Sequence, residues 1–146
     1  MSDNKRSRVL IVEDAQGLAT LYGQMLNDSG HTVTICGNPK LVNLLIENGE
    51  TFDLAILDIV LPPEDLELYS LQDCHRTGIR LMERMIRRMA CNRFYVITGL
   101  KDIQQQAEAI CGKSALLLFE YKLDYEPEEF VKNVDALLSR GFCASG

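Results

Sequence analysis

Side chains able to do chemistry follow four of the short apolar runs in this sequence. They comprise three carboxylates, one hydroxyl and one ammonium group: Glu13, Asp14, Asp58, Thr98 and Lys122. If the apolar runs are parallel strands, their C-terminal ends meet at one edge of a sheet, and ligands bind at that edge. We therefore expect these side chains to form one site.

The chemistry that this set of side chains favours is phosphoryl transfer assisted by a cation. Grouped carboxylates repel one another and raise one another's pKa, which a divalent cation relieves. Mg2+ is suitable because it binds a few carboxylate or carbonyl oxygens and keeps several waters. One carboxylate can then attack a phosphoryl group and form an aspartyl phosphate. The cation and Lys122 would neutralise charge on that group, and the Thr98 hydroxyl would donate a hydrogen bond to it.

Each residue also has an ordinary interpretation. Asp14 can cap a following helix, which is a common use of aspartate. Asp58 can be a turn residue, Thr98 a strand-end hydroxyl and Lys122 a solvated surface residue. Their coincidence at successive strand ends favours the shared site over four unrelated roles.

The elements that must position these side chains follow from the apolar pattern. Short continuous apolar runs are typical of strands buried on both faces of a parallel sheet. Strands are expected at residues 9–12, 32–36, 54–57, 94–97 and 115–119. Periodic segments that place apolar residues on one helix face are expected at residues 18–26, 39–48, 78–89, 102–111 and 127–140.

The alternation of strands and helices predicts one parallel sheet with helices on both faces and right-handed crossovers. The first helix should bury Leu18, Leu21, Tyr22, Met25 and Leu26. The third should bury Ile79, Met82, Met85, Ile86 and Met89, and the last Phe130, Val134, Leu137 and Leu138. Residues 64–77 have weaker patterning and are expected to form a long connection.

The bulk composition restricts the class of protein. The chain has 146 residues and a net charge of −6, which suits one acidic domain and disfavours direct binding of nucleic acid. The nearest approach to a basic patch is Arg84, Arg87 and Arg88, with Glu83 among them. No apolar stretch is long enough for a bilayer and residues 1–8 lack a signal-peptide core, so we expect a cytoplasmic protein without membrane contacts.

Cysteine spacing argues against a zinc or redox site. The chain has five cysteines, and no two form a C-x-x-C pair: Cys36, Cys74, Cys91, Cys111 and Cys143. They are expected to be reduced thiols.

Taken together, the sequence resembles a receiver domain of two-component signalling, of the single-domain, chemotaxis-regulator type. The matching text over residues 8–138 is VLIVED, DLAILDIVLP, GIRLMERM, FYVITG and LLLFEYK. The resemblance implies a flavodoxin-like, doubly wound α/β fold of five βα units with strand order 2-1-3-4-5. The receiver would span residues 8–140, between a disordered tail at 1–7 and a short tail at 141–146.

The resemblance also implies a response regulator that is phosphorylated on Asp58. The phosphoryl donor would be a sensor histidine kinase, a phosphotransfer protein or a small phosphodonor. Mg2+, for which Mn2+ is expected to substitute, would be held by Glu13, Asp14, Asp58 and the backbone carbonyl of Val60. The chain would catalyse only its own phosphorylation and dephosphorylation.

A switch is implied as well. Thr98 and Lys122 would contact the bound phosphoryl group, and Thr98 would move as Phe119 turns inward. The altered surface would bind a downstream protein target. By the resemblance, this surface is formed by the fourth and fifth helices and the fifth strand, where Lys101, Gln105 and Tyr121 are expected.

The sequence departs from the family pattern in three places. The loop after Asp58 is longer by an insertion at residues 62–77, which is interpreted either as a shield or partner-selecting element or as a tolerated surface insertion. Leu123 follows Lys122 where proline is usual, so a trans peptide bond is expected. Val60 and Leu100 are apolar, which predicts poor orientation of water and a long-lived phosphoryl group.

Other functions remain as alternatives. A pseudo-receiver would act as a protein-interaction module independent of phosphorylation. A haloacid-dehalogenase-like phosphatase needs a second aspartate where Val60 stands. A dinucleotide-binding oxidoreductase needs a glycine-rich turn where Glu13 and Asp14 stand, and their charges would repel a pyrophosphate.

Overall fold

A parallel β-sheet forms the centre of the molecule. The structure is a computed structural model, which describes residues 6–58, 71–99, 103–121 and 126–140. The strands are β1 (Arg8–Val12), β2 (Thr32–Cys36), β3 (Leu54–Leu57), β4 (Arg93–Thr98) and β5 (Leu116–Tyr121). They pair in the order β2-β1-β3-β4-β5, and all pairs are parallel. The predicted flavodoxin-like sheet and its strand order are therefore confirmed.

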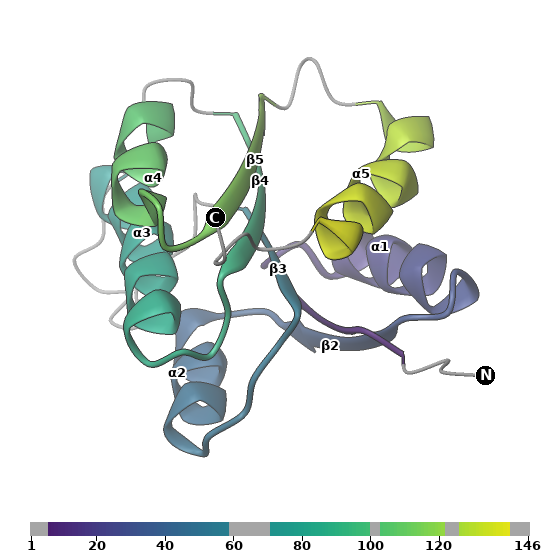
Figure 1. Cartoon of the computed structure of the whole chain (residues 1–146), viewed down its shortest axis with the longest axis horizontal. Helices are drawn as coiled ribbons and strands as arrows, with labels where there is room; N and C mark the ends of the chain where they lie inside the picture. The colour runs from purple at the N-terminus through teal and green to yellow at the C-terminus, as the bar shows by residue number, and fades with distance from the viewer. Residues whose placement is uncertain (1–5, 59–70, 100–102, 122–125, 141–146) are drawn as a thin grey trace.

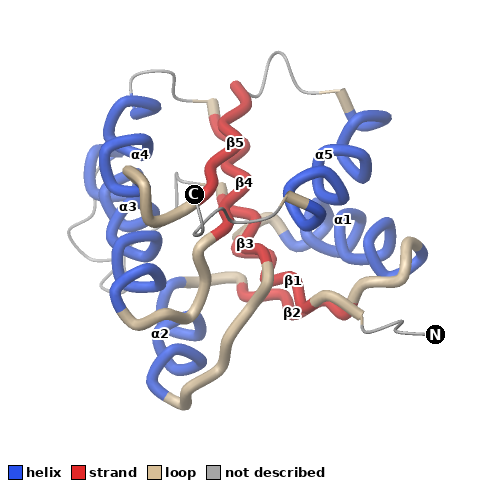
Figure 2. The backbone as a smooth tube through the Cα atoms, viewed as in Figure 1, coloured by secondary structure: helices blue, strands red, loops and turns tan. Residues whose placement is uncertain are grey.

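Helices cover both faces of this sheet. They are α1 (Gln16–Asp28), α2 (Pro39–Glu47), α3 (Leu71–Arg87), α4 (Gln104–Cys111) and α5 (Pro127–Ser139). Figure 1 shows α1 and α5 on one face and α2, α3 and α4 on the other. The tube in Figure 2 shows the same three layers, with the strands between two groups of helices. None of the helices in the described residues combines the length and the apolar character needed to cross a membrane.

The two faces of the sheet make two hydrophobic clusters because successive side chains of a strand point to opposite faces. In β1, Leu10 and Val12 pack in the cluster beneath α2, α3 and α4. Val9 and Ile11 pack in the cluster beneath α1 and α5. All four residues are fully buried, which explains why the strand reads as a continuous apolar run.

An aromatic stack joins α1, α5 and β4 within the second cluster. The ring of Phe130 on α5 stacks on Tyr22 of α1, with ring centroids 4.5 Å apart. Its ring also stacks on Tyr95 of β4, with centroids 5.8 Å apart. Tyr95 also forms hydrogen bonds with two polar side chains. Its hydroxyl donates to Glu120 of β5 and accepts a 3.0 Å hydrogen bond from Asn133 of α5.

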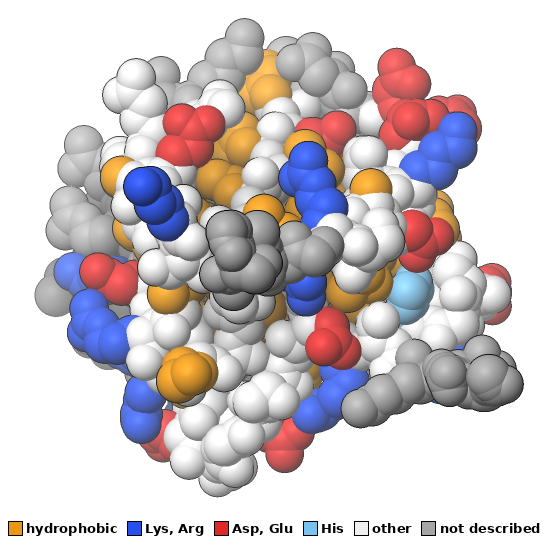
Figure 3. Space-filling model, viewed as in Figure 1, with side chains coloured by type: hydrophobic (Ala, Val, Ile, Leu, Met, Phe, Trp, Pro, Cys, Tyr) orange, Lys and Arg blue, Asp and Glu red, His pale blue; other side chains and the backbone are white. Residues whose placement is uncertain are grey.

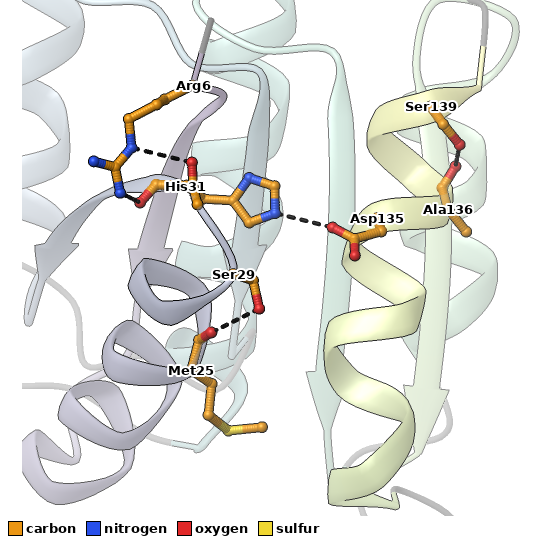
Figure 4. A network of polar contacts seen from close by, with 8 residues as sticks. Arg6, Met25, Ser29, His31, Asp135, Ala136 and Ser139 are labelled. Atoms are coloured by element: carbon orange, nitrogen blue, oxygen red, sulfur yellow. Dashed lines mark hydrogen bonds and ion pairs between the residues drawn. The ribbon is translucent and has the colours of Figure 1, made fainter. Parts of the chain in front are cut away.

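The start of the chain is tied to the rest of the fold from Arg6 onward. Arg6 donates hydrogen bonds to the carbonyl oxygens of Gly30 and His31, at 3.1 and 3.3 Å. His31 Nε2 lies 2.9 Å from Asp135 Oδ1 on α5 (Figure 4). The loop that carries Gly30 and His31 therefore contacts both Arg6, just before β1, and the last helix. Of the tail expected at residues 1–7, the structure describes residues 6 and 7, and the bounds of the tail stay a prediction. Residues 1–5 and 141–146 lie outside the described residues.

Two apolar residues that the helical pattern placed in the core are exposed. The exposed fraction of Leu21 is 50%, because α1 buries Ala19, Tyr22, Gly23 and Leu26 instead. Gly23 can lie on this buried face because it has no side chain: a Cβ there would stand 3.0 Å from the Ile35 side chain of β2. Met89 is 83% exposed because α3 has ended before it. The expected core positions in the last helix are confirmed.

The third helix begins earlier than the sequence pattern predicted. Helix α3 starts at Leu71 rather than Gly78, so residues 71–77 of the expected insertion are helical. Once a helix has formed, each further residue adds one hydrogen bond. Its first turns can therefore be helical without a stripe of apolar side chains. Residues 62–70 lie outside the described residues. Elsewhere the expected strand ends differ by one or two residues at β1, β4 and β5.

Candidate functional site

Three carboxylates meet at the C-terminal edge of the sheet. One carboxylate oxygen each from Glu13, Asp14 and Asp58 lies within 4.8 Å of the other two. No other group of three or more His, Cys, Asp or Glu side chains gathers in this way within the described chain. The prediction that the first and third strands bring their acidic ends together is confirmed in its geometry.

The register of the sheet creates this meeting point. Val12 pairs with Leu57, so β1 and β3 end side by side. The ladder continues one residue further, because the Asp58 N–H donates a 3.1 Å hydrogen bond to the Val12 carbonyl. Glu13 and Asp58 therefore leave neighbouring strand ends at the same level. No loop is needed to bring them together.

Glu13 is the buried member of the group, with an exposed fraction of 6%. Its backbone N–H donates to the Cys36 carbonyl at the end of β2. Its carboxylate accepts a 3.1 Å hydrogen bond from the N–H of Ala15, at the start of α1. The positive end of a helix dipole stabilises such a carboxylate. This bond fixes one carboxylate of the site before any ligand arrives.

Asp14 is exposed, and it does not cap the helix that follows it. The N-cap residue of α1 is Ala15, and no side chain caps the helix there. The ordinary interpretation of Asp14 as a capping residue is therefore wrong. A carboxylate oxygen of Asp14 lies instead within 4.8 Å of one from Glu13 and one from Asp58. Three anionic groups this close repel one another, and a hard cation with oxygen ligands fits the donor set.

The floor of the site is apolar. A small cavity beneath the carboxylates is lined by Glu13 and Asp58 together with Ile11, Val12, Tyr22, Ile56, Leu57 and Ile97. Such a floor restricts water on one side and strengthens electrostatic interactions above it. Tyr22 was predicted only as a core residue, and no sequence signal placed it next to the site.

A groove gives access to the site from the side. It runs between α1 and the start of α2 and is lined by Glu13, Asp14, Gln16, Thr20, Ile35, Asn38 and Leu41. Asn38 also shapes this edge, because its side chain accepts a hydrogen bond from the Leu41 N–H and begins α2. The exposed carboxylate of Asp14 can therefore be reached from solvent.

Thr98 stands at the same edge of the sheet, at the end of β4. Leu57 pairs with Val96, so the chain of β4 runs past the end of β3 and carries Thr98 to the level of the acidic group. The residue is fully buried, and it pairs in register with Tyr121 of β5. Its role as a phosphoryl contact stays a prediction.

Phe119 and Glu120 point to opposite faces of β5. Phe119 is half-buried and packs against the cluster beneath α3 and α4. It borders a surface groove together with Gln104, Glu108 and Cys111 of α4. Of the residues expected on the output surface, Gln105 is exposed on α4 and Tyr121 is half-buried on β5.

Several predicted site residues lie outside the described residues. These are Val60, Leu100, Lys101, Lys122 and Leu123. Their expected roles stay predictions.

The described cysteines do not form a site. Cys36, Cys91 and Cys111 are buried and free. Burial raises the pKa of the Cys91 thiol to about 12 and that of the Cys111 thiol to about 11. Protonated, buried thiols are poor metal ligands and poor nucleophiles. Cys143 and the side chain of Cys74 lie outside the described residues.

Comparisons of the sequence find no relative: no model of a known protein family matches, and no curated protein does. Solved structures do match. The non-phosphorylated HemR receiver domain from Leptospira biflexa is 22% identical, with 93% of this chain and 97% of that chain covered and a TM-score of 0.72. A CheY-like response regulator receiver domain protein from Methanospirillum hungatei is 24% identical, with 92% and 94% covered and a TM-score of 0.67.

A third match is the response regulator protein TrrA from Thermotoga maritima, solved in complex with Mg2+-BeF. It is 17% identical, with 90% of this chain and 98% of that chain covered, and its TM-score is 0.63. At such identities the likeness concerns the fold. The chain has the fold of response-regulator receiver domains, as the sequence resemblance implied.

Proposed function

We propose that this protein is a phosphorylation-activated signalling switch, in which Asp58 accepts a phosphoryl group in the presence of Mg2+. The observation that carries the proposal is the meeting of Glu13, Asp14 and Asp58 at one edge of a receiver fold. TrrA, a protein of the same fold, was solved with Mg2+-BeF, which supports the choice of cation. In the same proposal, the backbone carbonyl of Val60 is a further ligand of the cation, and Mn2+ can substitute for Mg2+.

The reaction is a displacement at phosphorus. A carboxylate oxygen of Asp58 attacks the phosphoryl group of a phosphohistidine or of a small phosphodonor. The new bond joins that oxygen to phosphorus, and the bond from phosphorus to the donor breaks with its electron pair on the donor. Mg2+ supplies charge neutralisation for the transferred oxygens.

The chain's own residues prepare this step. Glu13 is held by the Ala15 N–H, so its carboxylate is oriented in advance. The apolar floor formed by residues such as Ile56 and Ile97 keeps bulk water from the inner side of Asp58. Lys122 and the Thr98 hydroxyl contact the bound phosphoryl group. Thr98 then moves toward it and Phe119 turns inward, which changes the surface of α4, β5 and α5.

The partners follow from the same chemistry. A sensor histidine kinase or a phosphotransfer protein donates the phosphoryl group, and a downstream protein reads the altered surface in the cytoplasm. Val60 and Leu100 come two residues after Asp58 and Thr98 in the sequence, and we propose that their apolar side chains do not orient water. The phosphoryl group is therefore long-lived, and loss of the phosphoprotein signal within seconds of donor removal would contradict this.

Intact mass spectrometry after incubation with acetyl phosphate tests the proposal. A gain of one phosphoryl group is expected with Mg2+ and not with EDTA. Asp58→Asn should abolish the gain, while Asp28→Asn should retain it, because Asp28 is an exposed carboxylate at the far end of α1. A folded protein that gains no phosphoryl group with Mg2+ would instead be a pseudo-receiver, an interaction module independent of phosphorylation.

A further inference from the structure

The outer face of α3 carries a stripe of arginines. Arg80, Arg84 and Arg87 of α3 and Arg88, the residue directly after it, stand at offsets of 0, 4, 7 and 8, which is the spacing of one helix face. All four are exposed. Lys and Arg side chains gather along the side of the molecule that α3 forms (Figure 3). We call these four residues the arginine face.

Much of this positive charge is not neutralised. Arg87 pairs with Glu83 one turn earlier at 3.4 Å, and both side chains are more than half exposed. Arg84 donates a hydrogen bond to Asn43 of α2, which carries no charge. Arg80 and Arg88 have no ion-pair partner in the part of the chain that the structure describes. A concentrated positive face on a chain of net charge −6 is therefore left open.

The arginine face ends in an unusual helix terminus. The Ala90 N–H donates to the Met85 carbonyl at 2.8 Å, and the Met89 N–H donates to the Ile86 carbonyl at 3.1 Å. This pair of bonds is the Schellman motif, which puts Met89 in the left-handed region, at a φ of 57°. A side chain with a Cβ is strained in that conformation.

The other two helix ends of this kind in the described chain use glycine. Helix α1 ends with Gly30 at a φ of 96°, and α2 ends with Gly49 at a φ of 82°, with the same pair of backbone bonds. Only α3 has a large apolar residue at this position among the three. Burial does not offset this strain, because Met89 is 83% exposed. Strained residues that packing does not explain are concentrated at functional sites.

A groove with an apolar side adjoins Met89. Its apolar side is formed by Phe52, Ile86, Met89, Ala90 and Cys91, and its polar side by Thr51, Asn92, Ser114 and the carboxylate of Asp53. The groove is therefore suited to the apolar anchor, while the arginine face is suited to the acidic residues. The Phe52 N–H donates to the Ala90 carbonyl at 2.8 Å, so this groove lies at the start of β3. The acidic group lies at the opposite end of β3. A partner bound here would not compete with the cation or the phosphoryl donor.

We propose that the arginine face and Met89 form a docking surface for an acidic protein segment that also carries an apolar anchor side chain. Arginine suits carboxylates because its guanidinium binds them in a bidentate manner. The flexible, polarisable side chain of Met89 suits contact with an apolar anchor. The surface is independent of the phosphorylation of Asp58.

Charge decides between this partner and others. A nucleic acid would meet the repulsion of an acidic chain over the rest of its length. A membrane would require a broad apolar face, whereas the outer side of α3 is charged and Met89 stands at its end. A protein segment needs to cover only α3 and the groove beside it.

Fluorescence anisotropy with a fluorescein-labelled peptide of glutamate and leucine tests the proposal. Arg80→Ala/Arg88→Ala should weaken binding by about tenfold, because neither charge has an ion-pair partner among the described residues. Lys113→Ala/Lys132→Ala removes the same charge from exposed positions elsewhere and should change binding by less than about twofold. Equal weakening in the two double variants would overturn the proposal, since net charge alone would then explain the binding.

Met89→Gly removes the apolar contact without destabilising the fold. We expect this variant to bind the peptide about threefold more weakly while unfolding at a higher temperature than the parent protein. Unchanged affinity of the Met89→Gly variant would show that Met89 does not contact the peptide, and would overturn that part of the proposal. Single-stranded DNA or phosphatidylserine vesicles serve as competitors. If either binds through Arg80 and Arg88 and the acidic peptide does not displace it, the class of partner is wrong.

Discussion

The backbone N–H of Asp58 donates a 3.1 Å hydrogen bond to the carbonyl oxygen of Val12. This bond extends the β1–β3 ladder by one residue and sets Asp58 beside Glu13, the residue after Val12. The acidic site is therefore positioned by the register of the two central strands. A slip of one residue would turn each side chain to the opposite face and separate the carboxylates.

Asp14→Asn should weaken binding of Mg2+ by about tenfold, because one of three anionic groups is lost. In EDTA the same variant should unfold at a temperature equal to or about 1–3 °C above that of the parent, since repulsion among the carboxylates is relieved. Thermal unfolding with increasing Mg2+ measures both effects. Asp28→Asn is the control and should keep the Mg2+ response of the parent.

Thr98→Val should uncouple phosphorylation from the surface of β5. Valine has nearly the shape of threonine but no hydroxyl, and the site is fully buried, so a loss of about 1 kcal/mol in stability is expected. The variant should still gain a phosphoryl group on Asp58, while the NMR shift changes at Phe119 that phosphorylation causes should be lost. Parent-like shift changes at Phe119 would show that Thr98 does not transmit the signal.

Tyr95→Phe should destabilise the protein by about 0.5–1.5 kcal/mol, because Glu120 and Asn133 lose the hydroxyl that they share and keep the 3.5 Å hydrogen bond between them. The aromatic stack on Phe130 remains in this variant. Urea unfolding of Tyr95→Phe, Asn133→Ala and the double variant measures the coupling. We expect the two single effects to sum to more than the double effect, and simple additivity would mean that the network is not cooperative.

Met89→Gly should raise the free energy of unfolding by about 0.5–1 kcal/mol, because glycine accepts the left-handed conformation at the end of α3 without strain. Met89→Ala should not, since alanine keeps the Cβ that causes the strain. Chemical denaturation of both variants measures the difference. A stabilisation by alanine equal to that by glycine would place the effect in the exposed apolar side chain and not in the backbone.

Stability should fall at alkaline pH because of the buried thiols. The folded pKa of Cys91 is about 12 and that of Cys111 about 11, both raised by burial above the ordinary value of about 8.5. Below pH 8.5 both states keep these protons and the thiols do not affect the pH dependence. Above pH 8.5 the unfolded chain releases these protons before the folded protein does. The free energy of unfolding therefore falls by about 1.4 kcal/mol per pH unit for each thiol.

Urea unfolding between pH 7 and 10 measures this slope. Cys91→Ala should make it shallower above pH 9, while its lower stability at pH 7 reports the lost packing. An unchanged slope would assign the alkaline destabilisation to other groups, such as tyrosines and lysines.

Where the sequence prediction failed, the missing information lay in contacts between distant segments. The pattern of α1 placed Leu21 inside, but the helix buries Gly23 against Ile35 and leaves Leu21 exposed. The start of α3 at Leu71 was missed because its first turns carry no apolar stripe. The position of Tyr22 beneath the acidic group depends on how α1 packs on the sheet.

The sequence by itself determined the strands, their parallel arrangement and the acidic residues at the ends of β1 and β3. It could do so because burial on both faces leaves a continuous apolar run, and the residue that ends such a run is local information. Only the tertiary structure decided that Glu13 is oriented by the Ala15 N–H and that Asp14 does not cap α1. It also decided that Arg80 and Arg88 of the arginine face have no ion-pair partner among the described residues and that the face ends in a strained, exposed Met89. These properties depend on which groups lie nearby in space, and a linear pattern contains no distances between segments far apart in the chain.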